Sequence, residues 1–480
     1  MLLKKLNLAE FKSIYFIGIG GVGMSATAII AKNKGFLVAG SDAHQIYPPT
    51  SEILKQAKIF YAVGYRPANL QKFIKNNQAV LVVVGGGESE QGNVEVKLAL
   101  RKKIKIASFP QVIGELTKGY SNIVVAGAHG KTTTAAMVGW VMHQLKLQPN
   151  IWVGGEMKNF KTNAKLDAGK YFVMEGDEYK AAYWDNAPKF SYYHPQILIF
   201  HNLEVDHFDV YKNLAQLIAA VKKLVKQVPS SGLILANGDD DNLRSICRLA
   251  KARVIYYGFK KDNHFHPRQI GIKSNCNFFS LFAKNKKLAT FTLPQVGLHN
   301  IFNALPAIIL AKELGYDYLK ISLALKKFAG ITRRLEIKGR KRGIVVIDDY
   351  AHNPAKVKAA LAAVRLQFPL KRIWAVFEPH TYTRTYNTLS ALAQSFGNAD
   401  KVLLSEIYPA REKNLKKLSK LIDGQKVLLE ITKYHPFVSL AQNRQAGLAY
   451  LLANLKRGDV VVVMAVGAFN GLADELLKKL

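Results

Sequence analysis

Cysteine is scarce in this sequence. Only Cys247 and Cys276 occur among 480 residues, and their spacing matches no metal-binding motif. This scarcity argues against a disulfide framework and against a cysteine zinc site. The fold must therefore depend on hydrophobic cores rather than on covalent cross-links.

Long apolar runs are also missing. A membrane-spanning helix needs about 18 or more consecutive apolar residues, and no stretch of the sequence reaches that length. The apolar residues 14–17 near the N-terminus run into a glycine-rich turn, which is not typical of a signal peptide. We expect no membrane insertion and a cytoplasmic location.

Acidic residues are few relative to basic ones. The chain has 34 Asp and Glu against 68 Lys and Arg, which gives a formal net charge of +34. One interpretation is a nucleic-acid-dependent NTPase. The lysines are spread along the whole chain, however, so we favour general anion attraction over nucleic-acid binding. A hydrophobic content of 49% at this length predicts a globular chain of about two to four domains.

One stretch carries the strongest signal for chemistry. The apolar residues 123–126 predict a buried strand, a glycine-bounded loop follows, and a helix is expected over residues 132–140. The glycines let backbone N–H groups face a phosphate, and the helix N-terminus favours the same anion. The lysine adds a charge at the β- and γ-phosphates, and a threonine hydroxyl suits a magnesium ion. The residues of this shortened phosphate loop are Gly127, His129, Gly130, Lys131, Thr132 and Thr133.

A second glycine-rich turn follows residues 14–17. An acidic residue comes roughly twenty positions after its glycines, as in a dinucleotide-type strand–helix–strand unit. The residues concerned are Gly18, Gly20, Gly21, Gly23 and Asp42. The turn suits an NAD cofactor or the diphosphate of a UDP-sugar, because both present a pyrophosphate to a helix N-terminus. The residues alone leave both ligands open.

Acidic side chains follow two further apolar strands. Glu175 comes after residues 171–174, and a crowded group that includes His207 follows residues 197–200. Such crowding is costly without a cation or a reacting group. Carboxylate oxygens are ligands that Mg²⁺ prefers, so these clusters predict a magnesium ion beside a bound nucleotide.

A helix expected over residues 297–314 carries amides on one side. Asn300 and Asn303 lie three residues apart and face the same way. They can read the edge of a purine, although a helix cap at Asn300 is the better explanation when the motif is taken alone.

The last third of the chain alternates strands and helices, which predicts a parallel sheet. Polar residues gather where its strands end, the edge at which α/β sheets bind ligands. The candidates there are Arg334, Asp348, Tyr350, His352, His380 and Arg384.

Taken together, these motifs resemble those of the Mur ligases, the ATP-dependent amide-bond enzymes of peptidoglycan synthesis. Five motifs follow the family's order, at residues 127–134, 202–209, 297–304, 333–336 and 348–354, and the resemblance covers essentially the whole chain. The resemblance implies an α/β fold with three domains. These are a Rossmann-like UDP-sugar-binding domain (1–120), a central P-loop ATPase domain (121–330) and a Rossmann-like amino-acid- or peptide-binding domain (331–480).

The resemblance also implies a reaction. The carboxylate of UDP-N-acetylmuramate would attack the γ-phosphate of ATP, with Mg²⁺ as cofactor, and an amine would then attack the acyl phosphate. Some segments resemble family members that add L-alanine, and others resemble members that add the peptide L-Ala-γ-D-Glu-meso-diaminopimelate. Thr381 departs from the L-alanine pattern, in which an arginine is usual. We favour L-alanine and expect a monomer or weak dimer.

Residue roles follow from the same resemblance. The catalytic set is Lys131, His207, His352 and Arg384. The magnesium set is Thr133, Glu175 and His207. The ATP set adds Asn300 and Asn303 near the adenine, with Arg334 and Asp348 near the phosphates and ribose, to the phosphate loop. The amine set is Tyr350, His352, His380 and Arg384.

Overall fold

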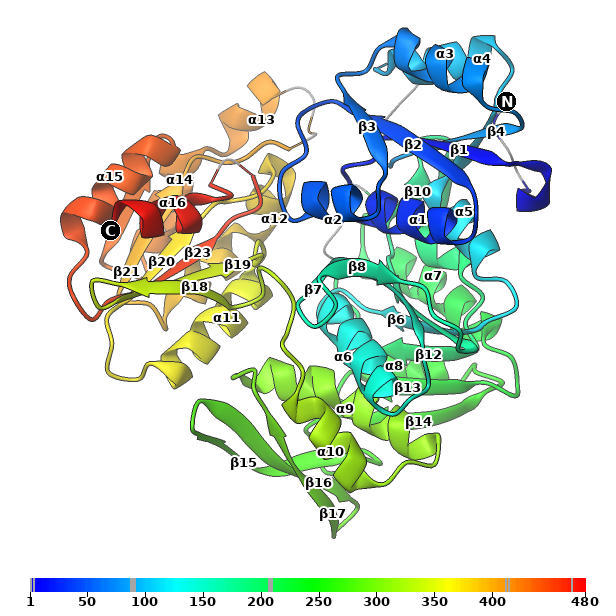
Figure 1. Cartoon of the computed structure of the whole chain (residues 1–480). Coiled ribbons are helices and arrows are strands. Elements are labelled where there is room, and N and C mark those ends of the chain that lie inside the picture. Colours follow the sequence, from blue (N-terminus) through cyan, green and yellow to red (C-terminus); the bar gives the residue numbers. More distant parts are fainter. Residues whose placement is uncertain are drawn as a thin grey trace.

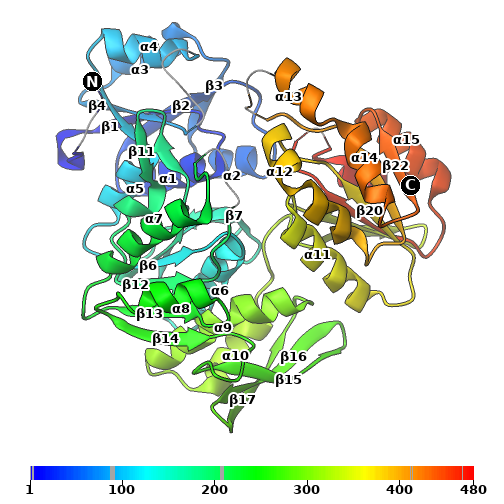
Figure 2. The same cartoon turned by 180° about the vertical axis from the view of Figure 1, so that it is seen from behind.

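The chain folds into three α/β lobes (Figure 1). The computed structural model describes residues 2, 5–86, 92–205, 210–410, 412, 415–467 and 469–480. The N-terminal and central lobes stack on each other, and the C-terminal lobe stands beside them, as the view from behind also shows (Figure 2). Within the described ranges, none of the helices combines the length and apolar character that crossing a membrane requires.

The N-terminal lobe contains a five-stranded sheet in the order β3-β2-β1-β4-β5, with every neighbouring pair parallel. The central strand β1 is wholly buried, because helices cover both faces of the sheet. Its strands are β1 (Ser13–Ile17), β2 (Leu37–Asp42), β3 (Phe60–Val63), β4 (Val80–Val84) and β5 (Lys105–Ser108). Its helices are α1 (Val22–Asn33), α2 (Thr50–Gln56), α3 (Pro67–Asn76), α4 (Val94–Arg101) and α5 (Phe109–Leu116).

The central lobe contains a seven-stranded sheet in the order β14-β13-β12-β6-β9-β7-β8, in which only the β7–β8 pair is antiparallel. Its strands are β6 (Ser121–Ala126), β7 (Asn150–Met157), β8 (Thr162–Lys165), β9 (Tyr171–Gly176), β12 (Ile197–Phe200), β13 (Leu233–Asn237) and β14 (Arg253–Tyr257). Its helices are α6 (Lys131–Gln144), α7 (Leu214–Gln227), α8 (Asp241–Cys247), α9 (Leu298–Glu313) and α10 (Tyr318–Lys326).

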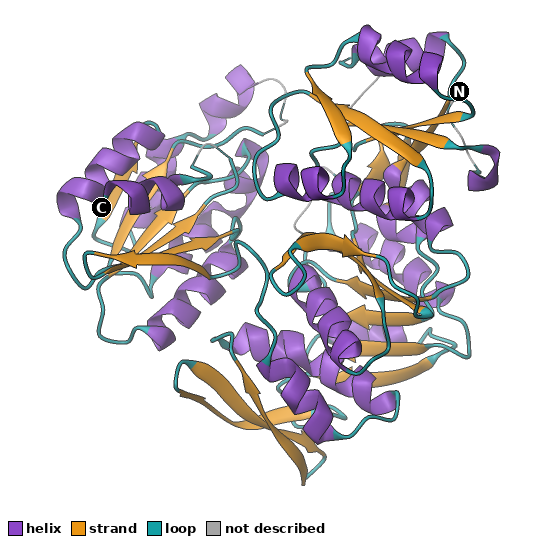
Figure 3. Ribbon diagram, in the orientation of Figure 1, coloured by secondary structure: helices purple, strands orange, loops and turns teal. Residues whose placement is uncertain are grey.

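Two smaller antiparallel units belong to the central lobe. One is the hairpin of β10 (Lys180–Ala182) and β11 (Asp185–Pro188). The other is the sheet of β15 (His266–Lys273), β16 (Cys276–Ala283) and β17 (Lys286–Leu293), at the far end of the lobe (Figure 3).

The C-terminal lobe contains a six-stranded sheet in the order β18-β19-β23-β20-β21-β22, parallel except for the edge strand β18. Its strands are β18 (Glu336–Lys341), β19 (Ile344–Asp349), β20 (Ile373–Phe377), β21 (Lys401–Ser405), β22 (Val438–Ala441) and β23 (Val460–Met464). Its helices are α11 (Pro354–Gln367), α12 (Tyr382–Ala393), α13 (Leu415–Leu421), α14 (Gly424–Thr432), α15 (Arg444–Asn454) and α16 (Leu472–Lys479).

The N-terminal and central lobes share a hydrophobic core, whereas the C-terminal lobe has separate ones. One cluster of buried residues continues from the N-terminal lobe into the central lobe. At its middle, the ring of Trp152 on β7 lies 6.3 Å from that of Phe109 on α5, and its indole N–H donates to the Thr27 hydroxyl on α1 at 3.2 Å. The C-terminal lobe has two core clusters of its own, drawn from residues 344–480.

The predicted α/β class and its three parallel sheets are confirmed, and several details differ. The helix after the phosphate loop begins at Lys131 and continues to Gln144, so it is longer than expected. Asp348 and Asp349 belong to β19 itself, because the strand continues to pair with β23 through both residues. The antiparallel sheet β15–β17 was not predicted. We propose domain boundaries at residues 120 and 330. In support, each of the three large sheets takes all its strands from one of the resulting segments.

Candidate active site

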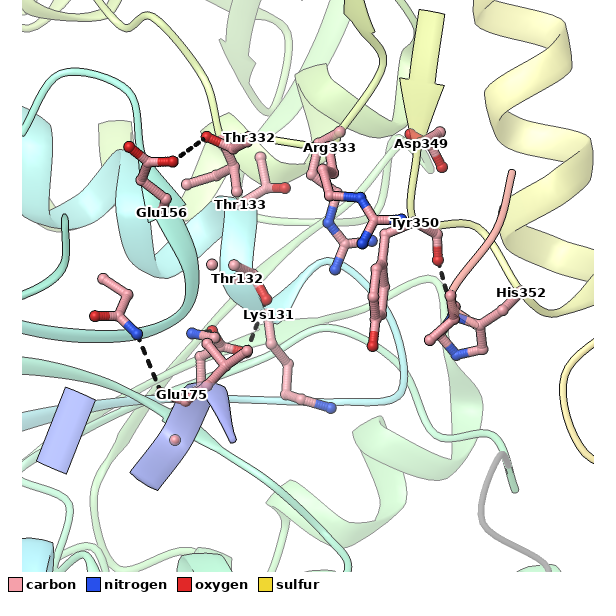
Figure 4. A pocket seen from close by; sticks show the side chains of 18 of the residues that line it. Lys131, Thr132, Thr133, Glu156, Glu175, Thr332, Arg333, Asp349, Tyr350 and His352 are labelled. Atoms are coloured by element: carbon pink, nitrogen blue, oxygen red, sulfur yellow. Dashed lines mark hydrogen bonds between the residues drawn. The ribbon is translucent and has the colours of Figure 1, made fainter. Parts of the chain in front are cut away.

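A cavity of about 1890 Å³ lies where the three lobes meet. It is lined by the glycine-rich turn of the N-terminal lobe, the phosphate loop of the central lobe, and residues that follow the strands of the C-terminal lobe. Figure 4 shows Lys131 from the start of α6 in the same pocket as Tyr350 from the end of β19. The fold therefore brings the main motifs of the sequence to one place.

The phosphate loop requires glycine at positions 127 and 130. Gly127 and Gly130 have φ angles of +125° and +83°, which other residues rarely adopt. A Cβ on Gly130 would lie 2.5 Å from Oδ1 of Asn303, and one on Gly127 would lie 3.0 Å from the backbone nitrogen of Asn202. The loop is thus packed between α9 and the residues that follow β12.

Lys131 is surrounded by acceptors. Its ammonium donates to the carbonyl of Gly127 at 2.7 Å and to Glu178 at 3.0 Å, and Asp177 lies 3.9 Å away. Burial alone would lower the pKa of Lys131, but Glu178, Asp177 and Glu175 together raise it above its usual value. The lysine is therefore charged at neutral pH and is held by groups that an incoming phosphate can replace.

The predicted magnesium residues are only partly described. Glu175 accepts hydrogen bonds from the Thr132 hydroxyl at 2.9 Å and from the backbone N–H of Gly154, and burial raises its pKa, with a contribution from Asp177. Thr133 also lines the cavity. His207 lies outside the described residues. Among the described side chains no group of three or more His, Cys, Asp or Glu has metal-binding geometry.

A hard cation nevertheless suits the donors that are present. Carboxylate and hydroxyl oxygens fit Mg²⁺, which commonly takes one or two protein ligands and completes its shell with phosphates and water. A cation would also relieve the repulsion between Glu175 and Asp177 that contributes to the raised pKa.

In the N-terminal turn, Asp42 contacts the loop directly. Its Oδ2 accepts a hydrogen bond from the backbone N–H of Gly20 at 2.8 Å, and a Cβ on Gly20 would collide with the same oxygen. Asp42 and the glycines Gly18, Gly20, Gly21 and Gly23 all line the cavity. The role of Asp42 at a ribose remains a prediction.

Asn202 is a loop residue to which sequence reasoning gave no role. Its Oδ1 accepts the backbone N–H of His129 at 3.0 Å, while the ring of His129 pairs with Glu204 at 2.8 Å. Asn202 thereby fixes the middle of the phosphate loop from the end of β12. The signal that could have found it was its place in the 202–209 motif.

A hydrogen-bonded chain ties the phosphate-loop helix to α9. Nδ1 of His201 is hydrogen-bonded to the Tyr257 hydroxyl at 2.9 Å and its Nε2 to the Thr134 hydroxyl at 2.7 Å, and Thr134 donates to the carbonyl of Asn303 at 3.1 Å. Burial, with the charge of Lys131, lowers the pKa of His201 to about 3. His201 is therefore neutral in the folded protein and works as a fixed spacer.

The two predicted adenine residues differ in their surroundings. Asn303 lies against Gly130 of the phosphate loop. The amide of Asn300 donates to the carbonyl of Val296, one turn earlier, at 3.0 Å. Both line the cavity, and their contact with adenine remains a prediction.

At the start of the C-terminal lobe, the ion pair is made by the residue next to a predicted one. Arg333, rather than Arg334, pairs with Asp348 at 3.1 Å. Both guanidinium groups lie over the ring of Tyr350, at 5.4 and 5.2 Å. Asp348 is absent from the cavity lining, whereas Asp349 is present. Burial raises the pKa of Asp348 to about 6 despite the nearby arginine. Direct contact of Asp348 with a ribose remains a prediction, and its absence from the cavity lining does not favour that contact.

The predicted amine residues converge. Nη1 of Arg384 donates to Nδ1 of His380 at 2.9 Å, and the rings of His380 and His352 lie 5.8 Å apart. Nδ1 of His352 donates to the carbonyl of Tyr350 at 2.8 Å, which leaves the basic lone pair of the ring on Nε2. Tyr408 closes the group, with its ring 5.9 Å from that of His380.

Comparison with known proteins agrees with this geometry. Three family models match the chain: "Mur ligase family, catalytic domain" over residues 13–121, "Mur ligase middle domain" over 125–311 and "Mur ligase, glutamate ligase domain" over 333–467. The UDP-N-acetylmuramate--L-alanine ligase of Alkaliphilus metalliredigens is 33% identical over 479 residues, which cover 99% of each chain. The chain belongs to the Mur ligase family.

Two solved Mur ligases have the same arrangement of domains. The murein peptide ligase of Psychrobacter arcticus is 28% identical, with a TM-score of 0.74 over 97% of this chain and 98% of that one. The UDP-N-acetylmuramate-alanine ligase of Thermotoga maritima has a TM-score of 0.79 over the same shares, at 22% identity, which shows a common fold. The predicted family is thus confirmed.

Proposed function

We propose that this Mur ligase joins L-alanine to the carboxylate of UDP-N-acetylmuramate and converts ATP to ADP and phosphate. The observation that carries the proposal is a single cavity containing both nucleotide loops and the His380–Arg384 pair. The name of the Alkaliphilus relative supports the choice of substrates. The acceptor carboxylate would attack the γ-phosphate, and the amine would then displace phosphate from the acyl phosphate.

The phosphate loop would stabilise the phosphoryl group during transfer. Gly130 and Lys131 line the cavity, and charge stabilisation with positioning is the main need of phosphoryl transfer. Lys131 would exchange its bond to Glu178 for one to the γ-phosphate. Because Glu178 and Asp177 already keep the lysine charged, no proton has to move when the nucleotide binds.

We also propose Mg²⁺ as the cofactor. Glu175 and Thr133 would hold it, together with His207 from outside the described residues. When bound, the ion neutralises charge on the β- and γ-phosphates.

The amine side explains the choice of L-alanine. The planar fork of Arg384 suits a free α-carboxylate, and the bond from its Nη1 to His380 fixes its direction. Nε2 of His352 is the nitrogen that can take a proton from the attacking amine. In the tripeptide the α-carboxylate of alanine is an amide, so the arginine would lose its anion, at a cost of about 3–5 kcal/mol if it stayed buried.

A murein peptide ligase is the second candidate. It is favoured by the 28% identity to the Psychrobacter arcticus enzyme, against 22% to the Thermotoga maritima L-alanine ligase. Thr381, which begins the amine-side helix α12, also departs from the L-alanine pattern.

Phosphate release measured with ATP, Mg²⁺ and UDP-N-acetylmuramate tests the proposal. L-alanine and L-Ala-γ-D-Glu-meso-diaminopimelate are supplied in parallel, and DNA replaces the sugar nucleotide in a third arm. Turnover with L-alanine alone supports the proposal. Turnover with the tripeptide alone makes the protein a peptide ligase, and DNA-stimulated hydrolysis would revive the NTPase interpretation.

A further inference from the structure

Lys189 is a buried lysine to which the proposed mechanism gives no task. It begins the short helix η2 (Lys189–Tyr192), directly after β11, and it lines the cavity. Only 8% of its surface is exposed. Lysine is rarely buried to this degree unless its charge is paired.

The pairing of Lys189 within the described residues is weak. Its ammonium lies 3.4 Å from Oδ2 of Asp177, which is a long hydrogen bond. Two aromatic rings complete its surroundings, with Tyr179 at 3.9 Å and Phe109 at 4.6 Å from the ammonium to the ring centre. Burial lowers the pKa of Lys189, and Asp177 only partly opposes this effect. An anion arriving from the cavity would stabilise the charged form of this desolvated lysine.

The position of Lys189 connects the two nucleotide loops. The Phe109 ring beneath it also packs on the N-terminal turn, since a Cβ on Gly23 would lie 3.2 Å from that ring. On its other side, Asp177 lies 3.9 Å from the ammonium of Lys131 in the phosphate loop. Lys189 thus shares one neighbour, Phe109, with the N-terminal turn and another, Asp177, with the phosphate loop.

We propose that Lys189 binds the carboxylate of the sugar-nucleotide acceptor and holds it beside the γ-phosphate. The inference rests on the function proposed above. The attacking carboxylate has to be brought close to another anion, the γ-phosphate, and a cation at Lys189 offsets that repulsion before reaction. Lys131 serves the phosphate, and Lys189 serves the carboxylate.

Two sugar nucleotides that differ in the carboxylate provide the test. UDP-N-acetylmuramate carries the lactyl carboxylate and UDP-N-acetylglucosamine lacks it, while both carry the diphosphate. Calorimetry on the whole protein gives a Kd for each ligand. For Lys189→Met we expect the Kd of UDP-N-acetylmuramate to rise about 10- to 100-fold, as for a lost charged hydrogen bond, while that of UDP-N-acetylglucosamine changes by less than about twofold.

Lys165 supplies a matched control. It is a partly buried lysine of the same lobe, ion-paired to Asp167 and lying 5.8 Å from the ring centre of Phe160, but it is absent from the cavity lining. Lys165→Met should leave both affinities unchanged. Lys189→Gln, which keeps a polar group of similar length, should show the same ligand-selective loss and serves if the methionine variant does not fold.

Each outcome decides between the claims. Equal weakening of both ligands by the Lys189 variants would assign the residue to the diphosphate or to local structure and overturn the inference. Unchanged affinities would overturn it as well. If the unmodified protein shows no preference for UDP-N-acetylmuramate over UDP-N-acetylglucosamine, the proposed function itself fails. If the Lys189 variants keep the preference for UDP-N-acetylmuramate, the inference about Lys189 fails but the proposed function stands.

Discussion

The two interfaces between the lobes are built differently. The N-terminal and central lobes meet through a continuous apolar core, in which Trp152 packs on Phe109 and donates to Thr27. The central and C-terminal lobes meet at the segment where Thr332 bonds to Glu156 through both its backbone N–H and its hydroxyl, at the Lys158–Glu336 ion pair, and where α9 lies near α11. Buried apolar area fixes relative position, whereas a few half-exposed hydrogen bonds do not.

This contrast indicates which parts move. The two glycine-rich loops belong to the lobes that share a core, so we expect their separation to stay constant. The amine residues belong to the lobe with separate cores. Positive φ angles at Gly330, Arg333 and Leu335 mark the segment between them. We infer that the C-terminal lobe closes over a fixed pair of nucleotide sites, a common way to exclude water and complete an active site.

The largest expected effect tests the independence of the two nucleotide loops. Lys131→Ala should lower the rate of ligation about 10³-fold or more, because one aimed charge is lost from phosphoryl transfer. The Kd of UDP-N-acetylmuramate should stay nearly unchanged, because the fixed lobes hold the N-terminal turn regardless of the phosphate loop. Rate and Kd are measured by phosphate release and calorimetry. A Kd that weakens as far as the rate would contradict the separation of the sites.

Two tryptophans compare the cores directly. Trp152→Ala and Trp374→Ala each remove a buried indole, at 2% and 3% exposure, and each should cost about 3–5 kcal/mol of unfolding free energy. Trp152→Ala should destabilise the N-terminal and central lobes together, and Trp374→Ala should destabilise the C-terminal lobe alone. Urea unfolding followed by hydrogen exchange in each lobe separates the two. Loss of protection in all three lobes for both variants would show a single cooperative unit.

The amine pocket provides the next test, because it belongs to the lobe that closes. Arg384→Ala should raise the KM for L-alanine about 10- to 100-fold, as expected for a lost charged hydrogen bond. The Kd values of both nucleotides should not change, since Arg384 belongs to neither of the proposed nucleotide sites. Arg365→Ala is the control, because Arg365 pairs with Asp400 at 2.6 Å and is absent from the cavity lining. Weaker nucleotide binding in Arg384→Ala would indicate that the lobes are coupled before closure.

Stability against pH separates the fixed lobes from the C-terminal lobe. His201 has a folded-state pKa of about 3 against an ordinary value of 6.5. Because the folded pKa is lowered, its contribution is fully present above pH 6.5 and is lost as pH falls toward 3. The unfolding free energy of the unmodified protein, relative to that of His201→Asn, should fall by about 2 kcal/mol between pH 7.5 and pH 5. Urea titrations at the two pH values measure this difference, and a constant advantage would mean that His201 is charged or solvated.

Asp348 should respond to pH in the opposite direction. Burial raises its folded-state pKa to about 6, so its contribution to stability is present at low pH and is lost as pH rises through 6. Acidification from pH 7.5 to pH 5 should therefore favour the C-terminal lobe relative to an Asp348→Asn variant. The same titrations, followed by hydrogen exchange in that lobe, measure the change. An unchanged difference would show that Arg333 keeps Asp348 ionised throughout.

The sequence was sufficient where structure is local. A strand, a glycine loop and a helix follow one another at Gly127 and Lys131, so the phosphate site could be located without tertiary information. The partners of that loop could not be found in this way, because Asn202 and Asn303 reach it from other elements. Lys189 was missed for a related reason. A lysine after a proline is typical of an exposed turn, and only the packing of three separate segments buries it.

The smallest expected effect concerns the segment that joins the central and C-terminal lobes. Thr332→Val removes the side-chain bond to Glu156, which is 2.9 Å long, and keeps the backbone bond of the same residue. Because the site is only partly buried, the substitution should change the unfolding free energy by no more than about 0.5 kcal/mol. This limit applies both to the joined N-terminal and central lobes and to the C-terminal lobe. The substitution alters how the closing lobe is held, so kcat and the KM for the amine should shift together by about two- to fivefold. Thr162→Val is the control, since its hydroxyl bonds to the backbone of Ala164 within β8 of the central lobe. If Thr332→Val instead destabilised all three lobes as strongly as Trp152→Ala, the polar segment would be a structural interface and the C-terminal lobe would not be hinged there.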